Sequence, residues 1–295
     1  MVAMSTVLIA TGGTIACTHD ELGALVPTKT AADLAALLDE PVRAIDFRRL
    51  DSTAIRLEDL DELIELVEEL SNEPDVDRII ITHGTDSLEE TAMALSLFHQ
   101  SLTPVVLTGA QRPFDDPEPD GPDNLRAALK AKGVGVLLQF GGITTPAWGA
   151  RKEHTTALQA FSAAEADFPE VVPLPRVKLA DQKVTICVAY PGAPRCAIDG
   201  AVRAGFQGIV VKGMGAGNVS PEMAEGIIDA VQGGTPVLLT TRVPNGPVNM
   251  IYGGPGGGKT LEAAGVVGAG VLHAGQARIV LAASLATGID LHEFF

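Results

Sequence analysis

Two threonines set in glycine turns are the residues in this sequence best placed to do chemistry. The apolar run 7–10 is followed by Thr-Gly-Gly-Thr at 11–14, and the apolar run 79–81 by Thr-His-Gly-Thr-Asp at 82–86. An apolar run that ends in glycine and a hydroxyl residue predicts a strand, a tight turn and an exposed side chain. Because ligands of open α/β sheets bind outside the carboxyl ends of strands, two such turns predict two hydroxyls that face one substrate.

A threonine hydroxyl becomes a nucleophile only when a base takes its proton. Asp86 and His83 are the nearest candidates in sequence, but alternation along a strand leaves the direction of His83 open. A histidine within an apolar strand is more often a core or supporting residue. The glycines Gly12, Gly13 and Gly84 let a ligand approach the backbone, whose amides can hold a carboxylate or a developing oxyanion.

Strand-like apolar runs alternate with helix-like amphipathic runs along the chain, which is the pattern of a doubly wound parallel sheet. The predicted strands are 6–10, 79–82, 105–107, 134–140, 184–190, 208–212 and 236–240, and the predicted helices are 56–70, 86–98, 123–130, 197–204, 221–231 and 274–286. The alternation breaks at 168–181, where three prolines fall within seven residues and predict a linker.

The fold class predicted from this pattern is α/β. We expect a larger N-terminal domain with a doubly wound, mainly parallel sheet over 1–168, a linker over 169–182, and a smaller C-terminal α/β domain over 183–295.

The composition excludes several classes of partner. Asp and Glu number 37 against 21 Lys and Arg, and a net charge of −16 argues against nucleic acid and anionic membrane surfaces. No apolar stretch is long enough to span a bilayer, and no basic region precedes the first strand as in a signal peptide. We therefore expect a cytoplasmic protein.

The three cysteines are Cys17, Cys187 and Cys196, an odd number without metal-ligand spacing, which indicates reduced thiols. Cys17 follows Thr14 by three residues, so a nucleophilic role has to be considered. Because no positive charge flanks Cys17 to lower its pKa, the sequence favours a small buried side chain.

Residues 253–260, Gly-Gly-Pro-Gly-Gly-Gly-Lys-Thr, match the phosphate-binding P-loop pattern letter for letter. A nucleoside triphosphatase also needs a carboxylate at a neighbouring strand end to hold its metal. Only 35 residues follow the motif, and the one later aspartate is Asp290 in the terminal segment. The context favours a flexible glycine-rich turn.

Several segments together closely resemble the bacterial-type L-asparaginase/glutaminase family. Its two signatures resemble 11–16 and 82–92, and further matching segments are 108–113, 213–218, 242–246 and 276–281. They span nearly the whole chain in the family's order, which makes the resemblance more specific than any single short motif.

The resemblance implies an amidohydrolase of the asparaginase type that requires no metal and no cofactor. Thr14 is similar to the family's nucleophile, which attacks the side-chain amide and forms an acyl-enzyme. Thr85, Asp86 and Lys152 resemble its second catalytic cluster, in which Lys152 keeps Thr85 able to relay a proton. Asp86 would also bind the α-ammonium of the substrate, for which a carboxylate is the natural partner.

The resemblance also implies substrate-binding residues, which are Gly13, Ser52, Thr53, Gly84, Ala110 and Asn218. Ser52 is expected to hold the α-carboxylate, and the Ala110 backbone carbonyl to orient the amide nitrogen. The expected reaction is hydrolysis of L-asparagine to L-aspartate and ammonia, with some glutaminase activity. Because the family's active sites lie between subunits, a homodimer or homotetramer is expected.

The sequence departs from the family in three places. Many members carry a tyrosine in the loop after the first motif, but 17–28 contains none, and the two tyrosines of the chain are Tyr190 and Tyr252. Thr53 stands where a glutamine often follows the carboxylate-binding serine. The glutamate that some members lend from a neighbouring subunit has no match, because glycines occupy 253–258. The preference between asparagine and glutamine therefore stays open.

Each assignment also has a plain structural alternative. Thr14 and Asp86 could cap the helices that follow them, and Lys152 could be a solvated surface charge. The missing tyrosine leaves open a non-catalytic amino-acid sensor on the same scaffold. The amidase subunit of a tRNA-dependent amidotransferase shares these motifs, but it normally carries an extra N-terminal domain, whereas this chain begins at its first predicted strand.

Overall fold

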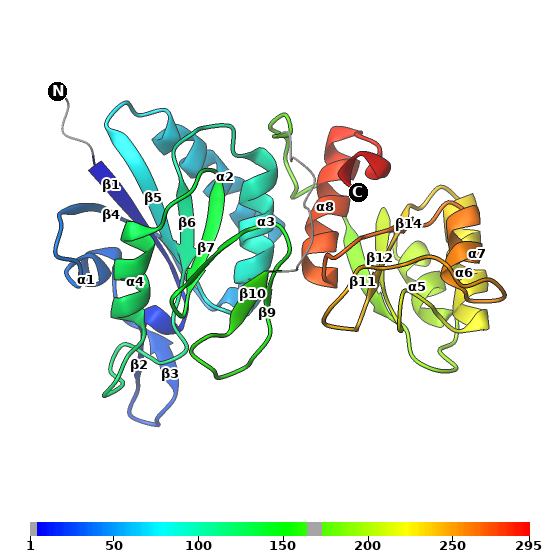
Figure 1. Cartoon of the computed structure of the whole chain (residues 1–295), viewed down its shortest axis with the longest axis horizontal. Helices are drawn as coiled ribbons and strands as arrows, with labels where there is room; N and C mark the ends of the chain where they lie inside the picture. The colour runs from blue at the N-terminus through cyan, green and yellow to red at the C-terminus, as the bar shows by residue number, and fades with distance from the viewer. Residues whose placement is uncertain (1–4, 164–172) are drawn as a thin grey trace. The chain divides into compact units, whose positions relative to one another are not determined.

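The computed structural model describes residues 5–163 and 173–295, and the chain divides into two compact units between residues 163 and 164 (Figure 1). Both units are α/β, and the first is the larger, so the predicted fold class is confirmed. Residues 169–172 of the predicted linker lie outside the described residues, and the predicted domain limits of 1–168 and 183–295 stay a prediction.

The described part of the first unit is built on a six-stranded sheet with the order β4-β1-β5-β6-β7-β8. Its strands are β1 (Ser5–Gly12), β4 (Val42–Leu50), β5 (Val76–Thr82), β6 (Val105–Thr108), β7 (Val136–Phe140) and β8 (Ile143–Pro146). All neighbours pair in parallel except β8, which is antiparallel to β7. Counted along the chain, the parallel strands have the order 2-1-3-4-5. The strand order of such a sheet reverses between β1 and β5, and ligands bind at that switch point.

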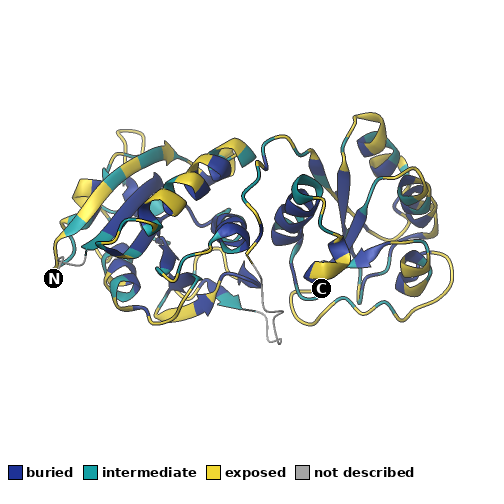
Figure 2. Cartoon of the chain, turned by 90° about the horizontal axis from the view of Figure 1, so that it is seen from above, coloured by how far each residue is buried: buried dark blue, intermediate teal, exposed yellow. Residues whose placement is uncertain are grey.

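Helices cover both faces of this sheet, which explains why its central strands are apolar throughout. On one face α1 (Ala31–Ala35) and α4 (Gly121–Lys130) pack against alternate residues of the strands, among them Leu8 and Ile80. On the other face lie α2 (Leu57–Ser71) and α3 (Leu88–Phe98). Figure 2 shows the central strands buried beneath these helices.

Five strands of the first unit, β2 (Cys17–His19), β3 (Leu25–Pro27), β4, β9 (Ala150–Lys152) and β10 (Phe161–Ala163), lack a sequence signal. The edge strand β4 reads Val-Arg-Ala-Ile-Asp-Phe-Arg-Arg-Leu, with charged residues between the apolar ones and no fully buried residue, so it contains no apolar run. A short hairpin follows the first turn, formed by β2 and β3. Outside the main sheet, β9 pairs with β10. Strands of three residues are too short for periodicity to reveal.

The second unit contains a parallel sheet in the order β11-β12-β13-β14. Its strands are β11 (Val184–Val188), β12 (Gly208–Gly213), β13 (Val237–Thr241) and β14 (Val267–Gly268). One face packs against α5 (Cys196–Arg203), α6 (Pro221–Gln232) and α7 (Gly258–Ala263), and the other against α8 (Ala274–Thr287). The predicted strands and helices of this half match the observed ones to within three residues.

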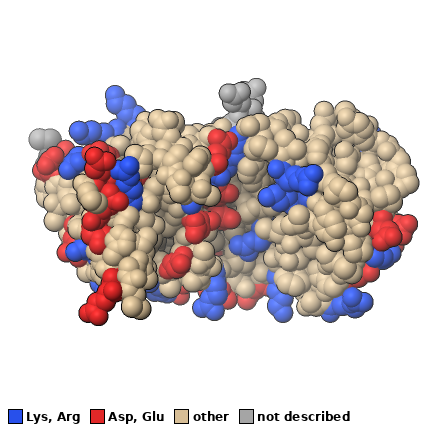
Figure 3. Space-filling model, turned by 90° about the horizontal axis from the view of Figure 1, so that it is seen from below, with Lys and Arg blue, Asp and Glu red and all other residues tan. Residues whose placement is uncertain are grey.

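Two observations concern the predicted partners. Within 5–163 and 173–295, no helix combines the length and the apolar character that crossing a membrane requires. On the face drawn in Figure 3, Lys and Arg side chains are interspersed with Asp and Glu. The exclusion of nucleic acid stays a prediction from net charge.

The turns after β1 and β5 lie in direct contact at the switch point. Ala10 pairs with Thr82 in the ladder, and Thr11 Oγ1 donates a hydrogen bond of 2.9 Å to the Thr82 carbonyl. Beyond them, Gly13 has a φ of 79°, and a Cβ added there would lie 2.3 Å from the Cα of Gly84. Glycine at 13 therefore permits this approach, while a Cβ at Gly84 would collide with the Ser52 hydroxyl at 2.6 Å.

This contact makes Gly13→Ala far more destabilising than the same change at Gly23. Gly23 has a similar φ of 78°, but a Cβ there would meet nothing within 4 Å. Gly23→Ala should lower the free energy of unfolding by about 1–2 kcal/mol of backbone strain. Gly13→Ala should lower it by on the order of 4 kcal/mol, because the backbone of one turn must move. Urea unfolding of both variants checks this, and equal losses would contradict the close contact.

Candidate active site

A cavity of about 220 Å³ opens at the contact between the two glycine turns. Its lining comes from the first turn and its hairpin, from the end of β4, and from the second turn: Gly13, Thr14, Cys17, Leu25, Pro27, Leu50, Asp51, Ser52, Gly84, Thr85 and Asp86. Six of the predicted site residues are in this set. Leu25, Pro27, Leu50 and Asp51 were not predicted, because β3 and β4 gave no sequence signal.

Thr85, Asp86 and Lys152 form one polar cluster at this cavity. Lys152 Nζ, at the end of β9, donates hydrogen bonds of 2.8 Å to Thr85 Oγ1 and 2.9 Å to Asp86 Oδ1. The lysine side chain is only 21% exposed, so it is not a solvated surface charge. Asp86 does not cap α3 either, because Ser87 occupies the N-cap position and the Asp86 carboxylate faces Lys152.

Thr14 is the first residue of a short 3₁₀ helix, η1 (Thr14–Ala16), whose N-cap is Gly13. Its side chain therefore does not cap that helix. Among the described residues, none accepts a hydrogen bond from Thr14 Oγ1 or donates one to it. Both Thr14 and Thr85 line the cavity, but only the Thr85 hydroxyl is held by a hydrogen bond, from Lys152.

Ser52 reaches the cavity from the short helix η2 (Ser52–Ala54) after β4. Its hydroxyl accepts a hydrogen bond of 3.2 Å from the Asp86 backbone N–H, and its carbonyl accepts one of 2.7 Å from Ser87 Oγ. This pair of bonds ties the end of β4 to the second turn. Thr53 is exposed and does not line the cavity; its N–H donates to Asp51 Oδ1.

Two further predicted residues lie elsewhere. Ala110 is buried after β6, the strand next to β5, but it does not line the cavity. Asn218 belongs to the second unit, where its side-chain carbonyl accepts a hydrogen bond of 3.2 Å from the Gly258 N–H.

His83 is a supporting core residue. It is fully buried, with Nδ1 2.8 Å from the Gly84 carbonyl and Nε2 2.9 Å from Thr91 Oγ1. Because a carbonyl can only accept, Nδ1 carries the proton and Nε2 accepts from Thr91. Burial lowers the pKa of His83 to about 4, although the bond to Gly84 opposes this shift. The neutral ring therefore links the Gly84 carbonyl of the second turn to Thr91 of α3.

Cys17 lines the cavity as a neutral thiol. Burial raises the pKa of Cys17, and the negative charges of Asp51 and Asp115 raise it further. Its Sγ donates a hydrogen bond of 3.3 Å to the Gly13 carbonyl. A raised pKa is the opposite of what a nucleophilic cysteine needs.

The P-loop-like segment does not form a phosphate cradle. In a P-loop the backbone amides of the glycine turn point at the phosphates. Here the N–H groups of Gly257, Gly258 and Lys259 donate instead to Gly254, Asn218 and Tyr252. The Lys259 ammonium pairs with Glu262. The expected flexible turn is wrong for the end of the motif, because Gly258, Lys259 and Thr260 form the first turn of α7.

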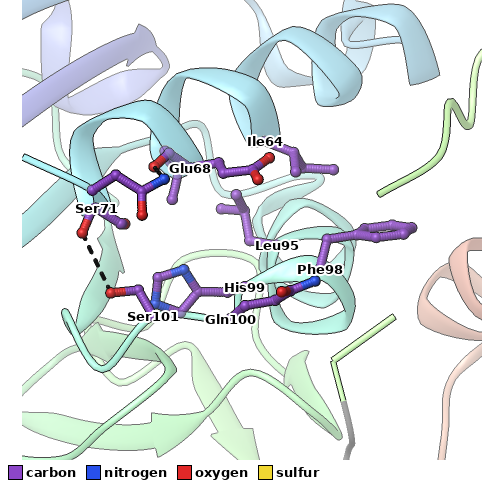
Figure 4. Close-up of a pocket in the computed structure, with 10 residues that line it drawn as sticks. Ile64, Glu68, Ser71, Leu95, Phe98, His99, Gln100 and Ser101 are labelled. Carbon is purple, nitrogen blue, oxygen red and sulfur yellow. Dashed lines mark hydrogen bonds between the residues drawn. The ribbon is translucent and has the colours of Figure 1, made fainter. Parts of the chain in front are cut away.

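A second cavity of about 310 Å³ lies between the carboxyl-terminal ends of α2 and α3 (Figure 4). Its lining is Ile64, Val67, Glu68, Ser71, Asn72, Leu95, Phe98, His99, Gln100 and Ser101. His99 Nε2 lies 2.7 Å from the Thr103 carbonyl, and burial lowers the pKa of His99. Glu68 is the one carboxylate in this lining, and it lies beside no Lys or Arg there. The cavity that Thr14 and Thr85 border is therefore the candidate active site.

The family models that match this chain show which class of α/β protein carries this fold. Residues 5–184 match the family model described as Asparaginase, N-terminal, and residues 183–294 match the one described as Glutaminase/Asparaginase C-terminal domain. The chain belongs to the asparaginase family, whose members are hydrolases that act on amides.

Relatives and solved structures agree with this assignment. The chain is 34% identical to a probable L-asparaginase of Deinococcus radiodurans, over 95% of this chain and 92% of that protein. It is 32% identical to a glutamyl-tRNA(Gln) amidotransferase subunit of Methanopyrus kandleri, over 88% of this chain and 66% of that protein. The thermostable L-asparaginase from Thermococcus kodakarensis superposes with a TM-score of 0.84 at 29% identity, covering 99% of this chain and 95% of that one.

The buried imidazole predicts a specific pH dependence of stability. In the unfolded chain a histidine binds a proton near pH 6.5, but folded His83 does so only near pH 4. Unfolding therefore takes up a proton between these values, and the His83 contribution to the free energy of unfolding falls as the pH drops from 6.5 to 4. The His83 contribution to the free energy of unfolding should change by up to about 1.4 kcal/mol per pH unit in this range.

His83→Asn keeps a donor for the Gly84 carbonyl and removes the titration. Urea unfolding of the wild type and this variant at several pH values between 4 and 8 isolates the effect, because other groups titrate in both proteins. The stability difference between them should narrow as the pH falls. A difference independent of pH would contradict the neutral buried ring.

Proposed function

We propose that this protein hydrolyses L-asparagine to L-aspartate and ammonia through an acyl-enzyme on Thr14. The observation that carries the proposal is the contact of Lys152 Nζ with Thr85 Oγ1 and Asp86 Oδ1, at the cavity that Thr14 also lines. Thr14 Oγ attacks the carbonyl carbon of the side-chain amide. In this proposal, backbone N–H groups of the second glycine turn stabilise the developing oxyanion, since the Gly13 N–H already donates to the Leu50 carbonyl.

The direction of the hydrogen bond between Lys152 and Thr85 defines the proton relay. An ammonium group can only donate, so Thr85 Oγ1 accepts from Lys152 Nζ and its own hydrogen is free to point into the cavity. Thr85 donates this proton to the leaving amide nitrogen, and it then takes up the proton that Thr14 loses when it attacks. Ammonia leaves, and water then cleaves the Thr14 ester to release aspartate.

The same reasoning assigns the α-groups of the amino acid. Ser52 Oγ accepts from the Asp86 N–H, which leaves the Ser52 hydrogen free to donate to the α-carboxylate. The Asp86 carboxylate retains an oxygen for the α-ammonium, and its side chain is 57% exposed. Gly13 and Gly84 contribute backbone to the same cavity, and we retain Thr53, Ala110 and Asn218 as proposed binding residues.

The proposal extends to the setting of the reaction. We propose secondary glutaminase activity, action without metal or cofactor, a homodimer or homotetramer, and a cytoplasmic location. The cytoplasmic location is supported by the three free cysteines and by a likeness to a structure described as a probable cytoplasmic L-asparaginase from Campylobacter jejuni, with a TM-score of 0.81 at 26% identity, covering 99% of this chain and 98% of that one.

One observation favours a second candidate function. Thr14 Oγ1 has no hydrogen-bond partner among the described residues, and 17–28 contains no tyrosine. A protein with an unactivated Thr14 would bind asparagine or aspartate as a sensor. Saturable binding of asparagine without ammonia release by the wild type would support the sensor and overturn the hydrolase.

Thr14→Ala should lower kcat for asparagine by about 10⁴-fold or more, because it removes the nucleophile. Thr85→Ala should lower kcat by about 10²- to 10⁴-fold, because it removes the proton relay. A coupled ammonia assay measures both, and unchanged melting temperatures would show intact folds. Thr6→Ala is the matched control, since Thr6 lies at the amino end of β1, away from the cavity. Near-normal turnover by Thr14→Ala would refute the mechanism.

The hairpin offers a test of how Thr14 is activated. Leu25 and Pro27 of β3 line the cavity, whereas Val26 between them does not. Leu25→Tyr should therefore raise kcat about tenfold or more, by placing a phenol beside Thr14. Leu22→Tyr at the exposed hairpin tip, where Leu22 is 93% exposed, serves as the control and should change nothing. Equal rates for Leu25→Tyr and the wild type would show that a tyrosine is not what the site lacks.

A further inference from the structure

Lys152 is attached to α3 at two points. Its Nζ contacts Thr85 and Asp86 in the turn before the N-cap Ser87, and its backbone N–H donates to the carboxylate of Glu89 in the first turn of the helix. The strand that carries Lys152 lies outside the main sheet and is three residues long. A two-stranded ladder of three residues is weak by itself. The position of the Lys152 backbone therefore depends on its hydrogen bond to Glu89.

We propose that Glu89 is a positioning residue for the amidohydrolase reaction: its carboxylate holds the Lys152 backbone so that Nζ stays between Thr85 and Asp86. The proposal rests on the function proposed above. A lysine side chain is a flexible four-carbon stem, and anchoring its backbone limits where the ammonium can reach. Misplacement of a catalytic group by about 1 Å can lower a rate by about 10²-fold.

The hydrogen bond from the Lys152 N–H to the Glu89 carboxylate should depend on pH, because burial and nearby charges shift the pKa of Glu89. Burial raises the pKa of Glu89 to about 7, and the neighbouring Glu90 on α3 raises it as well. The Lys152 N–H and the charges of Arg151 and Lys152 on β9 oppose the rise. The facing strand β10 reads Phe-Ser-Ala and adds no charge. Glu89 therefore changes between neutral and ionised near neutral pH.

The ionised carboxylate is the form that holds Lys152 more firmly. A charge-assisted hydrogen bond is roughly twice as strong as a neutral one. As the pH rises through about 7, Glu89 ionises, the Lys152 backbone is held more tightly, and kcat should rise. The acid side of the kcat profile should therefore report Glu89.

Stability should respond to pH in the opposite direction. An unfolded glutamate loses its proton near pH 4.5, but folded Glu89 keeps it until about 7. The folded state thus binds more protons between these values, and the Glu89 contribution to the free energy of unfolding falls as the pH rises from 4.5 to 7. Opposite responses of activity and stability distinguish a positioning carboxylate from a structural ion pair.

The test compares Glu89→Gln and Glu89→Ala with the wild type, measuring kcat and KM for asparagine between pH 5 and 9. Glutamine keeps an oxygen that accepts from the Lys152 N–H but carries no charge, so Glu89→Gln should show about the kcat that the wild type has at acid pH, with no acid limb near pH 7. Glu89→Ala should lower kcat by about 10²-fold with KM changed by less than about threefold. Glu58→Gln, in the exposed first turn of α2, is the control and should match the wild type.

Two further measurements keep the result interpretable. Glu89→Gln should melt higher than the wild type at pH 8, and this gain should shrink at pH 5. Crystal structures should show Lys152 Nζ displaced from Thr85 in Glu89→Ala and in place in Glu89→Gln. If Glu89→Ala does not fold, the pH profile and melting of Glu89→Gln carry the test.

The failures are separable. An unaltered acid limb in Glu89→Gln, or an undisplaced Lys152 with normal kcat in Glu89→Ala, overturns the role of Glu89 while hydrolysis by the wild type stands. Absence of hydrolysis by the wild type removes the proposed function instead. In that case the crystal structures and melting curves still decide whether Glu89 positions Lys152.

Discussion

The contact between the Gly13 and Gly84 turns is the constraint from which the rest of the site follows. Parallel strands β1 and β5 are neighbours at the point where the strand order reverses, and their turns meet with no room for a Cβ at Gly13. Because Thr14 and Thr85 each directly follow one of these glycines, both reach the same cavity. His83 supports this contact from inside the core, where its neutral ring joins the turn to α3 through Thr91.

The other groups of the site join this paired turn from elements that the sheet does not align by itself. Ser52 lies in η2, just after the edge strand β4, and accepts hydrogen bonds from Asp86 and Ser87. Lys152 arrives from β9, which pairs with β10 outside the main sheet. Thr14 and Thr85 are therefore positioned by backbone packing of the main sheet. Ser52 and Lys152 are positioned by side-chain hydrogen bonds, each of which contributes only modestly to stability.

This division also explains how much the sequence could predict. The buried strands show as apolar runs because helices cover both faces of the sheet, so the turns at Thr14 and Thr85 can be recognised from local pattern alone. Ser52 and Lys152 cannot be recognised in this way, because β4 is an edge strand interrupted by charged residues and β9 has three residues. Their placement came from the family resemblance. Leu25 and Asp51 were missed for the same physical reason, since short or exposed strands carry no hydrophobic period.

The buried ionisable groups beside the site act on the fold in opposite senses. His83 is stable as a neutral base, so acid weakens the fold through it, whereas Glu89 is stable as a neutral acid, so alkali weakens the fold through it. A glutamine at position 89 would accept the same hydrogen bond without that loss of stability. A carboxylate beside a second carboxylate, Glu90, is therefore better explained by what its charge does for Lys152 than by what it contributes to folding. The ionised form gives the Lys152 backbone N–H a stronger acceptor than the neutral acid does.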